Sequence, residues 1–175
     1  MKSATTPPLY AYCTFKTSLG WIAILLSDET VCRLSLAHAT SEEALAGIRP
    51  YLPENAQRMT SGNSLSKRIG DYADGFPDNF SDIAVDTDYL TPLGRTVFQH
   101  CRRIPYGQTR SYGQLALEAG RSNAARAVGQ FMASNRTPLI VPCHRVVASN
   151  GGLGGFSAPG GIALKEKLLM LEGSL

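Results

Sequence analysis

The sequence predicts an α/β (α+β) protein with a small N-terminal domain, residues 1–88, and a mostly helical C-terminal domain, residues 89–175. The first domain is expected to hold a β-sheet with flanking helices, and the second a helix-turn-helix of winged-helix-like form. Two observations predict this: short apolar runs fill the first 36 residues, and amphipathic helical patterns follow residue 90. With 175 residues, 43% of them apolar and 18% charged, the chain can bury a core.

Strands and helices are both expected in the first half. Three short apolar runs separated by turn residues predict a meander of strands at residues 9–16, 21–26 and 31–36. A helix is expected to open at Ser41 and to stop at Pro50, and a second to span residues 64–73. Residues 80–85 are predicted as a further strand, and residues 86–92 as the boundary between domains.

The second half is predicted to be helical. A helix should begin at Thr91-Pro92 and run to Ile104. Ser111 and Gln114 have the spacing of a capping box, and Gly120 is a plausible C-terminal stop for the helix between them. Ser122 or Asn123 is then expected to cap the next helix, which runs to about Ser134. Two short helices joined by residues 120–122 predict a helix-turn-helix.

The second of these helices has two unlike faces. A helical wheel places on one face Ala124, Ala127, Val128, Phe131 and Met132, and on the opposite face Ser122, Arg126, Gly129, Gln130 and Ala133. The opposite face is small apart from Arg126 and Gln130, so this helix could approach a groove closely and project one arginine into it. The alternative is an ordinary surface helix with an exposed arginine.

Charge is uneven along the chain. Residues 1–90 hold seven Lys and Arg against eleven Asp and Glu, whereas residues 91–175 hold ten against three. The basic half contains Arg95, Arg102, Arg103, Arg110, Arg121, Arg126, Arg136 and Arg145. This pattern favours a polyanion-binding domain beside one that does not bind the polyanion; the alternative is a solvated basic face. The longest apolar run, residues 21–26, is too short for a membrane span, and the N-terminus lacks the apolar region of a secretion signal. We therefore expect a soluble intracellular protein, in which four widely spaced cysteines are not needed as disulfides.

The dipeptide Cys143-His144 is the strongest chemical signal. Pro142 should place the cysteine at a bend, and a thiol with an ordinary pKa of about 8.5 needs a base or a positive field to become a nucleophile. His144 is the obvious base, but adjacent residues on extended backbone point to opposite sides, so a bridging water is the easier geometry. A carboxylate must orient the imidazole, and the acids of this half are Glu118, Glu166 and Glu172. The alternative is a buried structural cysteine beside a hydrogen-bonded histidine.

The motif Pro142-Cys143-His144-Arg145-Val146 resembles the active-site motif of the O6-alkylguanine-DNA alkyltransferases, also called methylated-DNA–protein-cysteine methyltransferases. The resemblance runs from about Thr96 to Leu153, and through a small insertion to Gly173. The first 85 residues resemble this family only loosely. The other matching segments are Ile104–Gly107, Ser111-Tyr112, Ala124–Gly129, Asn135 and Lys165 to Gly173.

The resemblance implies a role for each matching residue. Cys143 would attack the alkyl carbon on guanine O6, His144 would take the thiol proton through a water, and Glu172 would hold the imidazole. Asn135 would orient the elements around the site. Tyr112 would protonate guanine N3 as the base leaves, and Arg126 would fill the space of the extruded nucleotide from the minor groove.

The resemblance also implies two sets of contact residues. The DNA-binding set comprises Arg126, Tyr112, Ser111, Ala125, Gly129 and Arg110. The substrate pocket comprises Pro138, Val146, Ser149, Leu153, Gly154, Phe156 and Ser157. This chain departs from the family pattern in two places: Phe156 stands where the family generally has tyrosine, and Ala158-Pro159 resembles a two-residue insertion.

The expected activity is a DNA repair reaction of one turnover, because a thioether product offers water no activated carbonyl. The expected partner is double-stranded DNA containing O6-alkylguanine, with no cofactor, membrane or obligate protein partner, and the protein should be a cytoplasmic monomer, nucleoid-associated if prokaryotic. Zinc is not expected, since Cys13, Cys32, His38 and His100 do not match the spacing of zinc-binding members. The alternatives are a non-catalytic lesion-binding module of the same fold, a helix-turn-helix regulator and a cysteine hydrolase.

Overall fold

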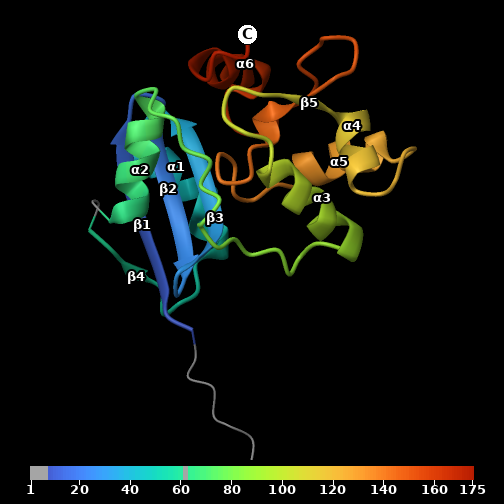
Figure 1. Cartoon of the computed structure of the whole chain (residues 1–175). Helices are drawn as coiled ribbons and strands as arrows, with labels where there is room; N and C mark the ends of the chain where they lie inside the picture. Colours follow the sequence, from blue (N-terminus) through green and yellow to red (C-terminus); the bar gives the residue numbers. More distant parts are fainter. Residues whose placement is uncertain (1–7, 61–62) are drawn as a thin grey trace, which may run out of the picture.

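The computed structural model describes residues 8–60 and 63–175 and confirms the mixed fold class (Figure 1). The N-terminal sheet has the order β3-β2-β1-β4. As the apolar runs predict, its first three strands form an antiparallel meander: β1 (Tyr10–Thr17), β2 (Gly20–Ser27) and β3 (Thr30–His38). The two-residue strand β4 (Gln57–Arg58), which no sequence pattern predicted, pairs in parallel with β1.

Helices cover both faces of this sheet. Ile22 and Ile24 of β2 share a core cluster with residues of α2 (Ser64–Ala73), whereas the alternate residues Ala23 and Leu25 pack with α1 (Ser41–Ile48). A short 3-10 helix, η1 (Arg49–Tyr51), follows α1. Because β2 is buried on both sides, its sequence is continuously apolar and does not alternate with polar residues.

The strand predicted at residues 80–85 is wrong. Phe80 has φ +48°, and among the described residues this segment forms β-type pairing with the sheet only at a bridge between Val31 and Val85. The guanidinium of Arg102 donates to the carbonyls of Phe80 and Ile83 at 2.9 and 2.6 Å. These carbonyls are thus satisfied by an arginine, and the segment passes from the sheet to the helical part as irregular chain.

The C-terminal helices match the prediction closely. They are α3 (Pro92–Arg102), α4 (Tyr112–Glu118) and α5 (Ala125–Ala133). Both halves of the capping box between Ser111 and Gln114 are present, and Gly120 has φ +75°. The expected cap of α5 is wrong: Ala124 stands at the N-cap, and no side chain caps the helix. Val128 and Met132 are buried, whereas Arg126 and Gln130 are exposed, as the helical wheel predicts.

Three further elements lie after α5. The chain turns through a 3-10 helix, η2 (Cys143–Arg145), into β6 (Val146–Val147), which pairs in parallel with β5 (Arg110–Ser111). A final helix, α6 (Gly161–Leu171), was not expected from the sequence. The division at residue 88 stays a prediction, and the core crosses it, since Leu139, Ile140 and Leu168 join the cluster beneath the N-terminal sheet.

Candidate active site around Cys143

A tight turn presents Cys143. Val141 is followed by Pro142 with φ −79° and ψ 63°, and the Cys143 amide donates to the Val141 carbonyl at 2.8 Å. The 3-10 turn that follows ends at Val146, where the chain becomes extended. The cysteine therefore lies at a bend, as the proline predicts, and the opposite-sides argument from extended backbone does not apply to Cys143 and His144.

The Cys143 thiol is buried but not inert. Its residue is 5% exposed, and Asn135 Nδ2 donates to Sγ at 3.1 Å. Burial raises the pKa of the thiol, while the hydrogen bond from Asn135 and the charge of Lys165 act in the opposite direction. Asn135 is itself held, because it also donates to the Val141 carbonyl at 2.8 Å and accepts from the Thr137 amide at 3.0 Å. Asn135 thus joins the sulfur to its own turn.

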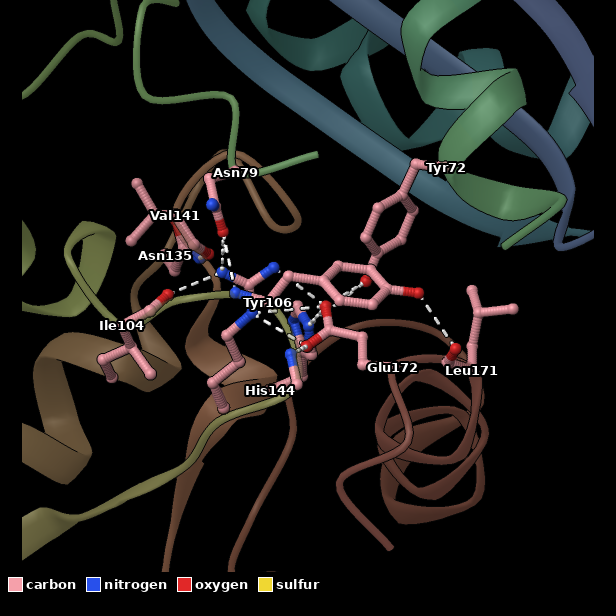
Figure 2. Close-up of polar contacts among 11 residues, drawn as sticks. Tyr72, Asn79, Ile104, Tyr106, Asn135, Val141, His144, Leu171 and Glu172 are labelled. Atoms are coloured by element: carbon pink, nitrogen blue, oxygen red, sulfur yellow. Dashed lines mark hydrogen bonds and ion pairs between the residues drawn. The ribbon is translucent and has the colours of Figure 1, made fainter. Parts of the chain in front are cut away.

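His144 and Glu172 form a buried pair (Figure 2). His144 Nε2 lies 2.9 Å from Glu172 Oε1, and both side chains are completely buried. Burial lowers the pKa of the imidazole, and the hydrogen bond and charge of Glu172 oppose that shift. Among the described residues the other ring nitrogen, Nδ1, is buried without a hydrogen-bond partner. With Nε2–H donated to the carboxylate, Nδ1 is left as a proton acceptor.

Glu172 receives several hydrogen bonds at once. Burial would raise its pKa, but hydrogen bonds from His144, Arg145 and Tyr72 hold the pKa of this carboxyl at about 2. Tyr72 donates to Oε1 at 2.6 Å (Figure 2). Arg145 donates to both oxygens at 2.9 Å. Of the three acids that the sequence left open, Glu118 instead pairs with Arg110 and Glu166 is exposed. Glu172 is therefore the carboxylate that contacts His144.

Three polar residues of this site were missed or misread in the sequence. Arg145 was grouped with the basic surface residues, but it is 1% exposed and donates to the Ile104 carbonyl at 2.7 Å as well as to Glu172. Lys165 is completely buried and donates to the Val146 carbonyl at 2.5 Å; burial lowers its pKa to about 8. Tyr72 comes from α2, and no motif marked it. Two signals were available in the sequence: Arg145 directly follows the Cys143-His144 pair, and Lys165 opens a segment that matches the family.

A cavity of about 630 Å³ opens beside the sulfur. Its lining comprises Tyr112, Gly113, Ala125, Arg126, Gly129, Met132, Ala133, Cys143, Ala148, Ser149, Gly155, Phe156 and Ser157. Predicted DNA-binding, pocket and catalytic residues thus meet at one place, although α4, α5 and the 148–157 loop bring them from distant parts of the chain. Burial raises the pKa of Tyr112, so this residue is a neutral phenol that can donate a proton.

Other predicted residues lie around this cavity and not in its wall. Pro138 lines a second cavity, of about 480 Å³, which also reaches Cys143 and Phe156. Val146 is completely buried, and Leu153 and Gly154 are half-buried. A Cβ added to Gly154 would lie 2.7 Å from the Tyr112 hydroxyl, so this glycine packs against the tyrosine.

The remaining predicted contact residues support the helix-turn-helix. Ser111 caps α4 and pairs with β6. Arg110 precedes it and lies 3.3 Å from Glu118.

Within residues 8–60 and 63–175, no three His, Cys, Asp or Glu side chains gather as a metal site. Over the same ranges, no helix has both the length and the apolarity of a membrane span.

Comparison with known proteins gives consistent matches. Residues 92–174 match a family model described as "6-O-methylguanine DNA methyltransferase, DNA binding domain". The methylated-DNA–protein-cysteine methyltransferase of Salmonella typhimurium is 42% identical over 129 residues, covering 71% of this chain and 72% of that protein. The corresponding protein of Metallosphaera sedula is 33% identical over 164 residues, covering 94% of each.

A solved structure agrees with these sequence matches. The crystal structure of a Mycobacterium tuberculosis protein in complex with DNA superposes with a TM-score of 0.76 at 30% identity, covering 94% of this chain and 93% of that one. An O6-methylguanine-DNA methyltransferase from a hyperthermophilic archaeon gives a TM-score of 0.71 at 25% identity. This chain belongs to the methylated-DNA–protein-cysteine methyltransferase family.

Proposed function

We propose that this protein repairs DNA by moving the alkyl group of O6-alkylguanine onto Cys143 in one irreversible turnover. The observation that carries the proposal is the sulfur of Cys143 in the wall of a cavity, with Asn135 and the His144–Glu172 pair beside it. The cavity volume lies within the roughly 300–1,000 Å³ typical of small-ligand sites. An extruded alkylated base is the substrate that this family membership indicates.

The acceptor needs a route for its proton. In the proposed mechanism the Cys143 proton passes through a bridging water to His144 Nδ1, the buried nitrogen that has no hydrogen-bond partner among the residues described. Glu172 accepts the Nε2–H and stabilises the imidazolium that forms. Lys165 adds a buried positive charge that favours the thiolate. These groups counteract part of the burial effect, which still leaves the pKa of the thiol above its ordinary value.

Transfer then exchanges one bond for another. The thiolate Sγ attacks the alkyl carbon, a C–S bond forms, and the bond between that carbon and guanine O6 breaks. The electron pair of the broken bond goes to the guanine, and the Tyr112 hydroxyl supplies a proton at N3. The product thioether has no activated carbonyl and a poor thiolate leaving group, so the acceptor is not regenerated.

Extrusion of the base is assigned to α5. A base stacked inside a duplex cannot reach the sulfur of a residue that is only 5% exposed, so the nucleotide must swing out. Arg126 is exposed on α5, and its neighbours in the cavity wall, Ala125 and Gly129, are small enough for close approach to the minor groove. Arg126 would then occupy the space that the extruded nucleotide leaves.

Arg126→Ala tests this extrusion role. We expect transfer from duplex DNA to slow far more than transfer from the free base O6-methylguanine, because only the duplex requires extrusion. Arg121→Ala is the matched control, since Arg121 is exposed just before α5 and does not line the cavity. Equal losses on both substrates in Arg126→Ala would defeat the extrusion role.

The transfer itself is tested by peptide mass analysis. The protein is incubated with a duplex containing O6-methylguanine, and the peptide containing Cys143 should carry one methyl group in place of the thiol hydrogen. Cys101, completely buried, is an internal control in the same sample. An unmodified Cys143 with duplex bound would favour a non-catalytic lesion-binding module or a regulator. More than one lesion repaired per molecule would contradict single turnover and favour a turnover enzyme such as a hydrolase.

The setting of the reaction follows from its substrate. We place the protein in the cytoplasm, and at the nucleoid if the cell is prokaryotic, where double-stranded DNA is the partner. It is proposed to act as a monomer without a cofactor or an obligate protein partner, because every residue assigned to the transfer lies on this one chain.

A further inference from the structure

One residue of the N-terminal half reaches into the site. Tyr72 lies on α2 and is 1% exposed. Its hydroxyl donates to Glu172 Oε1 at 2.6 Å and lies 3.3 Å from His144 Nε2 (Figure 2). This is the shortest of the hydrogen bonds that the structure describes at the Glu172 carboxylate. A side chain of α2, which covers the sheet, thus donates to the same carboxylate oxygen that accepts the hydrogen bond from the His144 imidazole.

The direction of this hydrogen bond is defined. Burial, followed by the charge of Glu172, raises the pKa of Tyr72 far above its ordinary value, so the group is a phenol and donates to the carboxylate. The ring is held by Phe80 at 5.7 Å and by Tyr106 in an edge-on contact at 5.9 Å between centroids. The hydroxyl position is therefore set by packing and not by the carboxylate alone.

A shared acceptor has a chemical consequence. A carboxylate that already accepts a strong hydrogen bond offers less negative charge to a neighbouring imidazolium. The hydroxyl of Tyr72 should therefore hold down the proton affinity of His144 and keep the imidazole neutral, ready to accept a proton. The other charged groups acting on His144 are Arg145 and Lys165, both of which favour the neutral ring.

We propose that Tyr72 is a positioning residue of the proton relay, through which the N-terminal half sets how strongly Glu172 stabilises a proton on His144. The proposal rests on the proposed function for its biological meaning, but its test does not need DNA. It gives the N-terminal half a role in the reaction, although residues 8–60 and 63–88 supply nothing to the wall of the 630 Å³ cavity.

Tyr72→Phe keeps the packed ring and removes only the hydroxyl. The titration midpoint of His144, followed by NMR of the imidazole, should rise by about half a pH unit or more. The midpoint of the Cys143 thiol, followed by the rate of alkylation with iodoacetamide, should fall, because a better-stabilised imidazolium favours the thiolate. A role confined to packing would not move the two midpoints in opposite directions.

Tyr106→Phe is the matched control. Its hydroxyl donates to the Leu171 carbonyl at 2.9 Å, next to Glu172 in the chain, without a hydrogen bond to the carboxylate. Both midpoints should stay at their wild-type values in this variant. Unchanged midpoints in Tyr72→Phe, or equal shifts in the two variants, would overturn the proposal.

A second variant keeps the test decisive if Tyr72→Phe does not fold. Replacing Tyr72 with 3,5-difluorotyrosine makes the phenol a stronger donor, so the His144 midpoint should fall and the thiol midpoint should rise. A shift in the reverse direction overturns the proposal. Failure of methyl transfer in the mass analysis would instead refute the proposed function, and it would leave these DNA-free titrations unaffected.

Discussion

The guanidinium of Arg145 and the carboxylate of Glu172 meet edge to edge in the protein interior. Arg145 Nε lies 2.9 Å from Oε2 and Nη2 lies 2.9 Å from Oε1, with the side chains 1% and 0% exposed. The same guanidinium donates to the Ile104 carbonyl and to Asn79. This two-point pair therefore ties the turn that carries Cys143 to the end of α6 and to the segment that leaves the sheet.

Loss of the carboxylate should destabilise the whole protein. In Glu172→Gln the Arg145 guanidinium stays buried without its counter-charge, so the free energy of unfolding should fall by about 3–5 kcal/mol. Urea denaturation measures this change. Glu166→Gln is the control, because Glu166 is exposed on the same helix and its loss should change the free energy of unfolding by less than about 0.5 kcal/mol. Similar losses in the two variants would refute the buried pair.

Acid should weaken the fold through the same carboxylate. The pKa of Glu172 is about 2 in the folded protein and ordinarily 4.5, so its contribution is fully present above 4.5 and is lost as pH falls towards 2. His144, whose pKa is lowered from 6.5 by burial, adds a loss that begins as pH falls below 6.5. The urea midpoint should therefore drop between pH 7 and pH 3, and more gently in Glu172→Gln. Parallel curves for the two proteins would contradict this assignment.

Asn135 should lower the pKa of the acceptor thiol. Asn135→Ala removes the donor that lies 3.1 Å from Sγ. A hydrogen bond to a charged group contributes about 1.5–3 kcal/mol, so the thiol pKa should rise by about one to two units. Iodoacetamide alkylation as a function of pH measures it. Asn135→Asp should raise the thiol pKa further by adding a negative charge. If the thiol pKa is the same in both variants as in the wild type, Asn135 does not lower it.

Gly154 should be required for the placement of Tyr112. Gly154→Ala puts a Cβ 2.7 Å from the Tyr112 hydroxyl at a backbone φ of +70°, whereas a Cβ at Gly151, with a similar φ of +83°, meets no atom within 4 Å. Displacement of the proton donor should slow single-turnover methyl transfer by about tenfold to a hundredfold in Gly154→Ala. Gly151→Ala, which carries the same kind of backbone strain away from Tyr112, should transfer at close to the wild-type rate. Equal rates for the two variants would show that Tyr112 does not depend on this contact.

Local sequence rules determined much of the architecture. The apolar runs of the meander, the capping box at Ser111, the positive φ of Gly120 and the buried stripe through Val128 and Met132 are all present. Each depends on residues within a few positions of one another, so periodicity and capping chemistry suffice to predict them. The pair Cys143-His144 could be singled out for the same reason, because its chemistry is carried by adjacent residues.

Local rules failed where a group is stabilised by a distant partner. Residues 80–85 look like a strand, yet Arg102 satisfies their carbonyls, and Arg145 looks like a surface charge, yet Glu172 balances it in the interior.

The sequence by itself thus determined the helix-turn-helix and the reactive dipeptide. Only the tertiary structure decided that Glu172 is the carboxylate that binds His144, and that Tyr72, from the other half of the chain, donates to the same carboxylate oxygen. The physical reason is that burying a charged or polar group is favourable only when its partners are assembled around it, and these partners come together only in the folded chain.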